Sequence, residues 1–160
     1  MPTSATTGRS RGASPRLRLT LQNAARSRTL PPAARFRRWA RAALARDAEI
    51  TLRVVGGPEG RRLNRDYRGR DYATNVLSFG YGTETPVSGD IVLCAPVVRR
   101  EARERGISAE AHYAHLTVHG VLHLQGHDHV RRRDAEAMQA LETRIVMALG
   151  YADPYGEDAE

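Results

Sequence analysis

The sequence contains no lysine, so all 25 of its basic residues are arginine. Positions 1–46 also lack acidic residues and carry 11 arginines, whereas the rest of the chain carries 14 arginines against 18 acidic residues. A basic stretch without acids favours a polyanionic partner, with nucleic acid the first candidate. A GC-rich genome also produces arginine in place of lysine, so the charge by itself is only suggestive.

A single cysteine, Cys94, excludes an intramolecular disulfide and fits a reducing compartment. It ends the apolar run 91–93, and this position favours a buried core thiol over a nucleophile. No apolar run is long enough to span a bilayer, and the first 15 positions lack the apolar stretch of a secretory signal. We therefore expect a cytoplasmic protein without a membrane partner.

The length suits a single domain with its own hydrophobic core. Residues 1–15 are rich in Ser, Thr, Gly, Arg and Pro, which predicts a disordered extension, although an organelle transit peptide has a similar composition. We expect residues 16–155 to form the domain and residues 156–160 to form a short acidic tail.

Apolar periodicity predicts the secondary structure. Alternating patterns indicate strands at 17–21, 50–54, 75–79 and 90–94, the last two joined by a loop over 80–89. Helical patterns indicate helices at 31–44, 58–67, 96–104, 108–126 and 132–149. The last helix is expected to bury Ala135, Met138, Leu141, Ile145 and Leu149. This order predicts an α+β domain, with a small mixed sheet of about four strands, about five helices and a metal site on a central helix.

All six histidines lie between positions 112 and 129. His119 and His123 are four residues apart, which on a helix places their Cβ atoms about 5–6 Å apart on one face. Gly126 can end this helix in a left-handed conformation, after which His129 returns toward the pair. Three imidazoles with a fourth position for water are typical of a catalytic zinc site, and the spacing therefore predicts one.

Imidazole ligands suit nickel, copper and iron as well as zinc, so another divalent metal remains an alternative. Asp128 is expected to orient a ligand imidazole, and His127 and Asp128 are both candidates for the general base. His112 and His115 lie one and two turns upstream, and we expect them to be ordinary polar or partly buried histidines. The zinc peptidase motif requires a glutamate where Gly120 stands, which argues against proteolysis.

Five arginines lie close together before the third predicted strand: Arg61, Arg62, Arg65, Arg68 and Arg70. A guanidinium can bind phosphate bidentately and stabilise the charge that develops at phosphorus, whereas most members of such a patch are solvated surface charges. The strand start carries Thr74, Asn75 and Ser78, which would contact RNA or pair with backbone at the strand end.

Two sequence blocks resemble the YbeY family of bacterial endoribonucleases. Residues 119–129, HGVLHLQGHDH, resemble the family signature H-G-x-L-H-L-x-G-x-D-H. Residues 63–71, LNRDYRGRD, with TNVLSF at 74–79 resemble a second family block, and GDIV at 89–92 resembles its following strand. The similarity covers roughly residues 17–155. Departures are Arg70 in place of lysine, Ala73 in place of proline, and a short loop over 80–89.

The resemblance implies a metal-dependent, single-strand-specific endoribonuclease that acts in ribosomal RNA maturation, notably at the small-subunit 3′ end, and in ribosome quality control. It implies zinc ligands at His119, His123 and His129 and a functional arginine at Arg68. Expected partners are single-stranded or ribosomal RNA and the small ribosomal subunit with its proteins. Arg65 and Arg70 are candidate RNA contacts, together with Thr74, Asn75 and Ser78. Two alternatives remain: a ribosome-assembly factor with a structural metal, and a metal-dependent hydrolase of a smaller substrate.

Overall fold

The computed structural model describes residues 14–82, 84–127 and 131–156. In this part of the chain a four-stranded sheet has the order β1-β2-β4-β3. Its strands are β1 (Leu17–Asn23), β2 (Ala48–Val55), β3 (Val76–Gly80) and β4 (Val87–Cys94). Strands β1, β2 and β4 are parallel, and β3 pairs antiparallel to β4 as an edge strand. The sheet is therefore mixed, as expected from the sequence.

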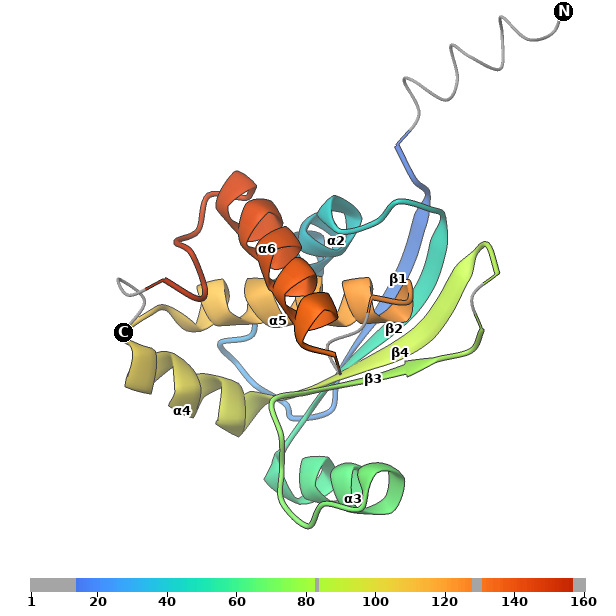
Figure 1. The fold of residues 1–160 in the computed structure, drawn as a ribbon. Helices are drawn as coiled ribbons and strands as arrows, with labels where there is room; N and C mark the ends of the chain where they lie inside the picture. Colours follow the sequence, from blue (N-terminus) through green and yellow to red (C-terminus); the bar gives the residue numbers. More distant parts are fainter. Residues whose placement is uncertain (1–13, 83, 128–130, 157–160) are drawn as a thin grey trace, which may run out of the picture.

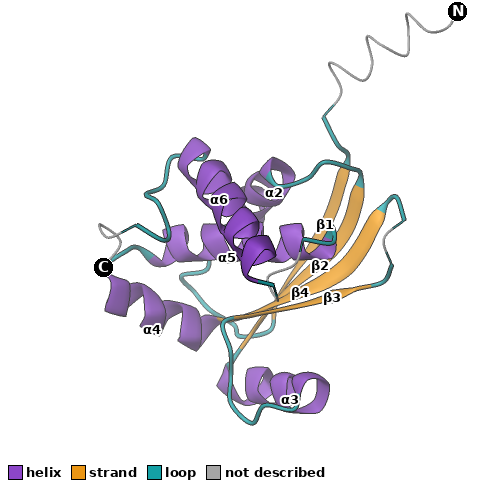
Figure 2. Cartoon of the chain, in the orientation of Figure 1, coloured by secondary structure: helices purple, strands orange, loops and turns teal. Residues whose placement is uncertain are grey.

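Five helices accompany the sheet in the described residues: α2 (Ala33–Ala42), α3 (Gly57–Arg68), α4 (Ala95–Arg105), α5 (Ala109–Leu124) and α6 (Arg132–Ala148). Helices α2, α5 and α6 lie over one face of the sheet, and α3 lies on the opposite side (Figure 1). Figure 2 shows α5 as the central helix, with α2 and α6 beside it. The predicted α+β architecture with a central histidine-bearing helix is confirmed.

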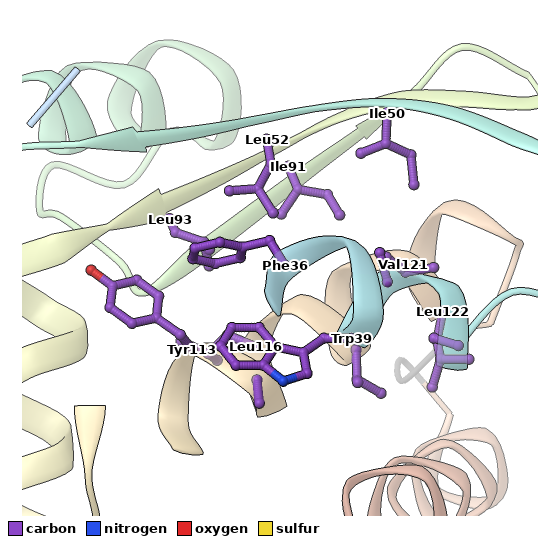
Figure 3. Packing of buried hydrophobic residues seen from close by; sticks show 14 of the residues in the cluster. Phe36, Trp39, Ile50, Leu52, Ile91, Leu93, Tyr113, Leu116, Val121 and Leu122 are labelled. Atoms are coloured by element: carbon purple, nitrogen blue, oxygen red, sulfur yellow. The ribbon is translucent and has the colours of Figure 1, made fainter. Parts of the chain in front are cut away.

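The core between α2, α5 and the sheet is built around aromatic side chains (Figure 3). The rings of Phe36 and Trp39 meet edge to face with centroids 5.0 Å apart, and Phe36 meets Tyr113 in the same way at 5.7 Å. Such pairs add to the stabilisation from buried area. This packing fixes the position of α5 against the sheet and so fixes where its histidines lie.

The ends of α5 follow from local chemistry. The hydroxyl of Ser108 accepts a hydrogen bond from the backbone N–H of Ala111 at 3.0 Å, the geometry of a helix N-cap. Gly126 has a φ of 96°, a conformation that favours glycine. The expectation for Gly126 is confirmed, and the helix ends at Leu124, one residue after the second candidate ligand, His123.

Strand β4 begins at Val87, three residues before the predicted start, so the prediction of a loop as far as Gly89 is wrong. Parallel pairing with β2 runs from Val87 opposite Ala48 to Cys94 opposite Val55. A Cβ at Gly89 would lie 2.5 Å from a methyl group of Leu124. Glycine here allows α5 to approach the strand closely and does not mark a turn.

Cys94 is buried, and burial raises the pKa of its thiol, as expected of a core cysteine. The predicted apolar stripe of α6 is confirmed at Met138, but it also holds a charged residue, Glu142, that the sequence analysis did not single out. Among the described residues, no helix has the length and apolar character needed to cross a membrane.

Candidate functional site

A cavity of about 410 Å³ lies among the end of α3, the segment leading into β3, and α5. We call it the histidine–arginine pocket. Seven of the expected site residues line it: Arg68, Arg70, Thr74, Asn75, Ser78, His119 and His123. Arg65 is not among the residues that line the pocket, and its guanidinium instead pairs with Asp66 at 3.1 Å. Segments more than 40 positions apart in the sequence thus form the walls of one cavity.

His119 and His123 occupy successive turns of α5. Their ring centroids are 6.2 Å apart and the ring planes are inclined by 73°. The helical spacing predicted this pairing on one face, and both rings line the pocket. Two imidazoles so arranged are suited to bind the same metal ion.

A buried carboxylate on α6 holds one of these rings. Glu142, only 1% exposed, accepts hydrogen bonds from Nδ1 of His119 at 2.9 Å and Nε2 of His115 at 2.7 Å. The hydroxyl of Tyr155 donates to the same carboxylate at 2.6 Å. Because Nδ1 of His119 donates to Glu142, Nε2 is the nitrogen through which this ring would bind a metal.

The ionisation of Glu142 reflects two opposing effects. Burial favours the protonated acid, but the hydrogen bonds from His115 and His119 outweigh burial and lower the pKa of Glu142 to about 2. Burial and the bond to Glu142 raise the pKa of Tyr155. The carboxylate is therefore anionic and Tyr155 is a neutral donor at neutral pH.

Gly120 lets α5 pack closely against the sheet beside the pocket. A Cβ at this position would lie 3.0 Å from a side-chain carbon of Ile91 and 3.2 Å from Oγ of Ser78. The space is too small for the glutamate that the zinc peptidase motif has at this position. The close approach thus supports the argument against proteolysis and brings the histidine-bearing turn next to β3.

Arg68 also lines the histidine–arginine pocket. It is the last residue of α3, where Gly69 ends the helix with a φ of 71°. Its guanidinium donates to the backbone oxygen of Ser78 at 2.9 Å and lies over the ring of Phe79, 5.6 Å from the ring centroid. These two contacts hold a charged, planar donor at the rim of the pocket.

The other members of the arginine patch differ in their surroundings. Arg61 donates twice to Asp71, at 2.7 Å and 2.9 Å, and this bond lowers the pKa of Asp71. Arg70 lines the pocket, like Arg68. The patch is therefore divided, because Arg61 and Arg65 face carboxylates whereas Arg68 and Arg70 face the cavity.

Asn75 has a structural partner as well as a place in the pocket. Its side-chain amide donates to Oε1 of Glu101 at 2.9 Å, and Nε2 of His112 donates to the same oxygen at 2.8 Å. His112 is fully buried and His115 nearly so, although the sequence analysis expected partial burial at most. Both are hydrogen-bonded to carboxylates, which explains how polar rings occupy the interior.

The residues present fit a metal ion. Two imidazoles line one pocket, and a buried anionic carboxylate accepts a hydrogen bond from one of them, as carboxylates that orient metal-binding histidines do. Within residues 14–82, 84–127 and 131–156, no group of three or more His, Cys, Asp or Glu side chains could hold a metal. The expected third ligand, His129, and the expected positioning residue, Asp128, lie outside the described residues.

Glu142 is the site residue that sequence analysis missed. Its signal was present, because Met138, Glu142 and Val146 are four residues apart on the apolar face of one helix. A carboxylate in such a stripe must be paired to be buried. Its partners are 23 and 27 positions away in the sequence, and no local motif identifies them.

The endoribonuclease YbeY family matches residues 22–150 of the chain, a range that includes every residue of the histidine–arginine pocket. Endoribonuclease YbeY of Methylibium petroleiphilum is 60% identical over 146 residues, which cover 91% of this chain and 98% of the relative. The same enzyme of Aromatoleum aromaticum is 59% identical over 147 residues, covering 89% and 95%. The solution structure of TM1509 from Thermotoga maritima matches with a TM-score of 0.57 at 23% identity, covers 88% of this chain and 99% of that protein, and supports the fold. The chain belongs to the endoribonuclease YbeY family.

Proposed function

We propose that this protein is a metal-dependent endoribonuclease specific for single-stranded RNA, acting at the 3′ end of small-subunit ribosomal RNA and in ribosome quality control. Family membership makes it a hydrolase of RNA phosphodiester bonds and implies a role in ribosomal RNA maturation. The observation that carries the finer proposal is that Arg68 and the pair His119 and His123 line one cavity. A phosphate held by the guanidinium would lie beside the metal ligands.

His119, His123 and His129 would hold the metal, zinc by preference and nickel or another divalent ion as the alternative. When bound, zinc would act as a Lewis acid that activates water for hydrolysis at neutral pH. Glu142 acts as a positioning residue, since its bond to Nδ1 fixes the tautomer and orientation of the His119 ring. Asp128 is proposed to do the same for another ligand.

Arg68 would bind the scissile phosphate and stabilise the negative charge that grows on it during cleavage. Its contacts with Ser78 and Phe79 support this role, because a guanidinium that is already oriented loses little side-chain entropy when the phosphate binds. Arg70, Thr74, Asn75 and Ser78 line the same pocket and would bind the neighbouring RNA backbone. Arg65 would contribute only long-range attraction.

The proposed partners are single-stranded or ribosomal RNA and the small ribosomal subunit with its proteins, in the cytoplasm. The support is the family membership together with the arginines that face the pocket. His127 and Asp128 are both candidates for the general base.

Arg68→Ala tests the catalytic proposal. Loss of one electrostatic contact to a transition state commonly slows a reaction about 10²–10³-fold. We expect single-turnover cleavage of single-stranded RNA to fall by that factor, while RNA affinity falls much less and metal content is unchanged. Arg68→Lys should restore part of the rate, because ammonium keeps the charge but not the bidentate geometry.

Arg65→Ala is the matched control, an arginine of the same helix that pairs with Asp66 outside the pocket. It should cleave at nearly the wild-type rate. If Arg68→Ala also cleaves at that rate, Arg68 has no catalytic role and the ribosome-assembly alternative gains support.

A further inference from the structure

We infer that the groove on the α3 side of the sheet, lined by Tyr67, Phe79 and Tyr81, binds an unpaired base of the RNA that flanks the cleaved phosphate. We call it the aromatic groove; its volume is about 620 Å³. The inference rests on the proposed function, because the phosphate in the histidine–arginine pocket sets which base reaches the groove. It adds a second binding site on the opposite face of the same edge strand.

The strand geometry explains why aromatic side chains gather here. Along β3 and just beyond it, Leu77, Phe79 and Tyr81 alternate with residues that face α5, so they share the α3 face. Tyr67, from the last turn of α3, meets Phe79 edge to face with centroids 5.4 Å apart. Tyr67 is 67% exposed and Tyr81 66% exposed, which leaves ring surface open to solvent. Aromatic rings exposed beside a basic site are suited to stack on unpaired bases.

Arg68 joins the two sites. Its guanidinium lies over the ring of Phe79 in the aromatic groove and also lines the histidine–arginine pocket. Because β3 is the edge strand of the sheet, only one strand separates the two openings. An RNA chain with a phosphate at Arg68 can therefore pass over this edge and place the next base against Tyr67 or Tyr81.

The charges in the aromatic groove favour a base over a phosphate. Arg53 is its basic side chain, and Glu59 already pairs with it through two hydrogen bonds of 2.8 Å and 3.1 Å. Asp90 adds a second carboxylate, which accepts a hydrogen bond from the hydroxyl of Tyr81. This groove would repel backbone phosphate, but it offers acceptors for the amino groups of a base and rings for stacking.

The test uses Tyr67→Leu and Tyr81→Leu, singly and together, because leucine keeps apolar bulk but removes the aromatic face. The probes are a single-stranded decanucleotide and inorganic phosphate, which can bind at Arg68 but has no base to place in the groove. Binding is measured with a chelator present, so that no RNA is cleaved, and cleavage is measured separately with metal. Loss of base stacking should weaken decanucleotide binding about 5- to 150-fold per base, with little change for inorganic phosphate. Met147→Ala, which removes an exposed apolar side chain of α6 instead, should bind both probes like the wild type.

Unchanged decanucleotide affinity in the double variant would overturn the inference, and so would an equal loss for both probes. Thermal unfolding of each variant shows whether it is folded, and the exposed positions of both tyrosines make wild-type stability the expected result. If the wild type cleaves no RNA but its binding still depends on the two tyrosines, the proposed function fails and the groove assignment stands. If the wild type cleaves RNA and the tyrosines have no effect on binding, the groove assignment fails and the proposed function stands.

Discussion

Helix α5 carries two carboxylate–histidine clusters that look alike and lie in different surroundings. In the first, Nε2 of His112 donates to Glu101 of α4 at 2.8 Å. In the second, Nε2 of His115 donates to Glu142 of α6 at 2.7 Å, and Nδ1 of His119 donates to the other oxygen at 2.9 Å. The chemistry of the bonds is the same, but only the second cluster contains a ring that lines the histidine–arginine pocket.

The comparison shows that a buried histidine–carboxylate bond does not by itself mark a functional site. The Glu101 cluster ties α4 to α5 and also accepts from Asn75, so it joins three segments of the fold. The Glu142 cluster ties α6 to α5 and, through His119, reaches the cavity that Arg68 also lines. We therefore expect changes in the first cluster to affect stability and changes in the second to affect metal binding.

The largest expected difference is in metal content. His119→Ala or His123→Ala should reduce it from about one ion per chain to near none, because two remaining ligands bind a metal weakly. RNA cleavage should be lost with the metal. His112→Ala should keep the metal, since its ring bonds to Glu101 away from the pocket. Elemental analysis of the purified proteins measures the metal content, and full metal retention in His123→Ala would overturn the assignment of His123 as a metal ligand.

A smaller effect on metal affinity is expected to distinguish the two carboxylates, Glu142 and Glu101. Glu142→Gln should weaken metal binding about 10- to 100-fold, the usual result of losing a second-shell partner. Glutamine offers one acceptor oxygen where Glu142 accepts from three donors, so the His119 ring would be less well oriented. Affinity is measured by competition with a chelator, on metal-free protein whose folding is checked by circular dichroism.

Glu101→Gln is the matched control for that measurement, because it alters a carboxylate–histidine bond of similar length, 2.8 Å, to another histidine of α5. Its metal affinity should stay within about threefold of the wild type, since its partner is not a ligand. Equal losses in the two variants would make Glu142 an ordinary structural carboxylate and erase the distinction between the clusters.

The sequence predicted the parts of the site that lie close together along the chain. The four-residue spacing of His119 and His123 predicted that both rings lie on one face of a helix, and the dense run of arginines identified the region of Arg68. The strand and helix order also followed from periodicity, because each element buries one face. What these features share is that the physical cause acts within a few residues.

The sequence could not predict features that depend on distant packing. Gly89 looked like the end of a loop, yet it lies in β4 because Leu124 of α5 occupies the space of a side chain. Glu142 could not be assigned to the site from the sequence, because its partners lie on α5 and near the C-terminus.

The stability of the first cluster gives a third test. His112→Ala should lower the free energy of unfolding by about 2–4 kcal/mol, because it leaves a cavity and deprives Glu101 of a donor. Chemical denaturation of the metal-free protein measures this change. An unchanged midpoint would show that the Glu101 cluster does not stabilise the fold, even though His112 is completely buried.

The smallest expected effect is a pH dependence of stability that arises from His112. Burial lowers the pKa of this histidine, and Arg105 and the neighbouring His115 act in the same direction, whereas the bond to Glu101 opposes them without overcoming burial. The unfolded chain therefore binds a proton at pH values where folded His112 does not. Its contribution to stability is complete above about pH 6.5, and it decreases as pH falls from there to the lower folded pKa.

One proton changes the free energy of unfolding by at most about 1.4 kcal/mol per pH unit. To isolate the contribution of His112, the measurement compares denaturation of the metal-free wild type with His112→Gln between pH 7.5 and 5.5. The glutamine variant keeps a neutral side-chain amide that can donate to Glu101 but has no titrating ring. It should lose less stability than the wild type as pH falls. Parallel pH profiles would show that His112 takes up its proton equally in both states, and burial would then not control the ionisation of the first cluster.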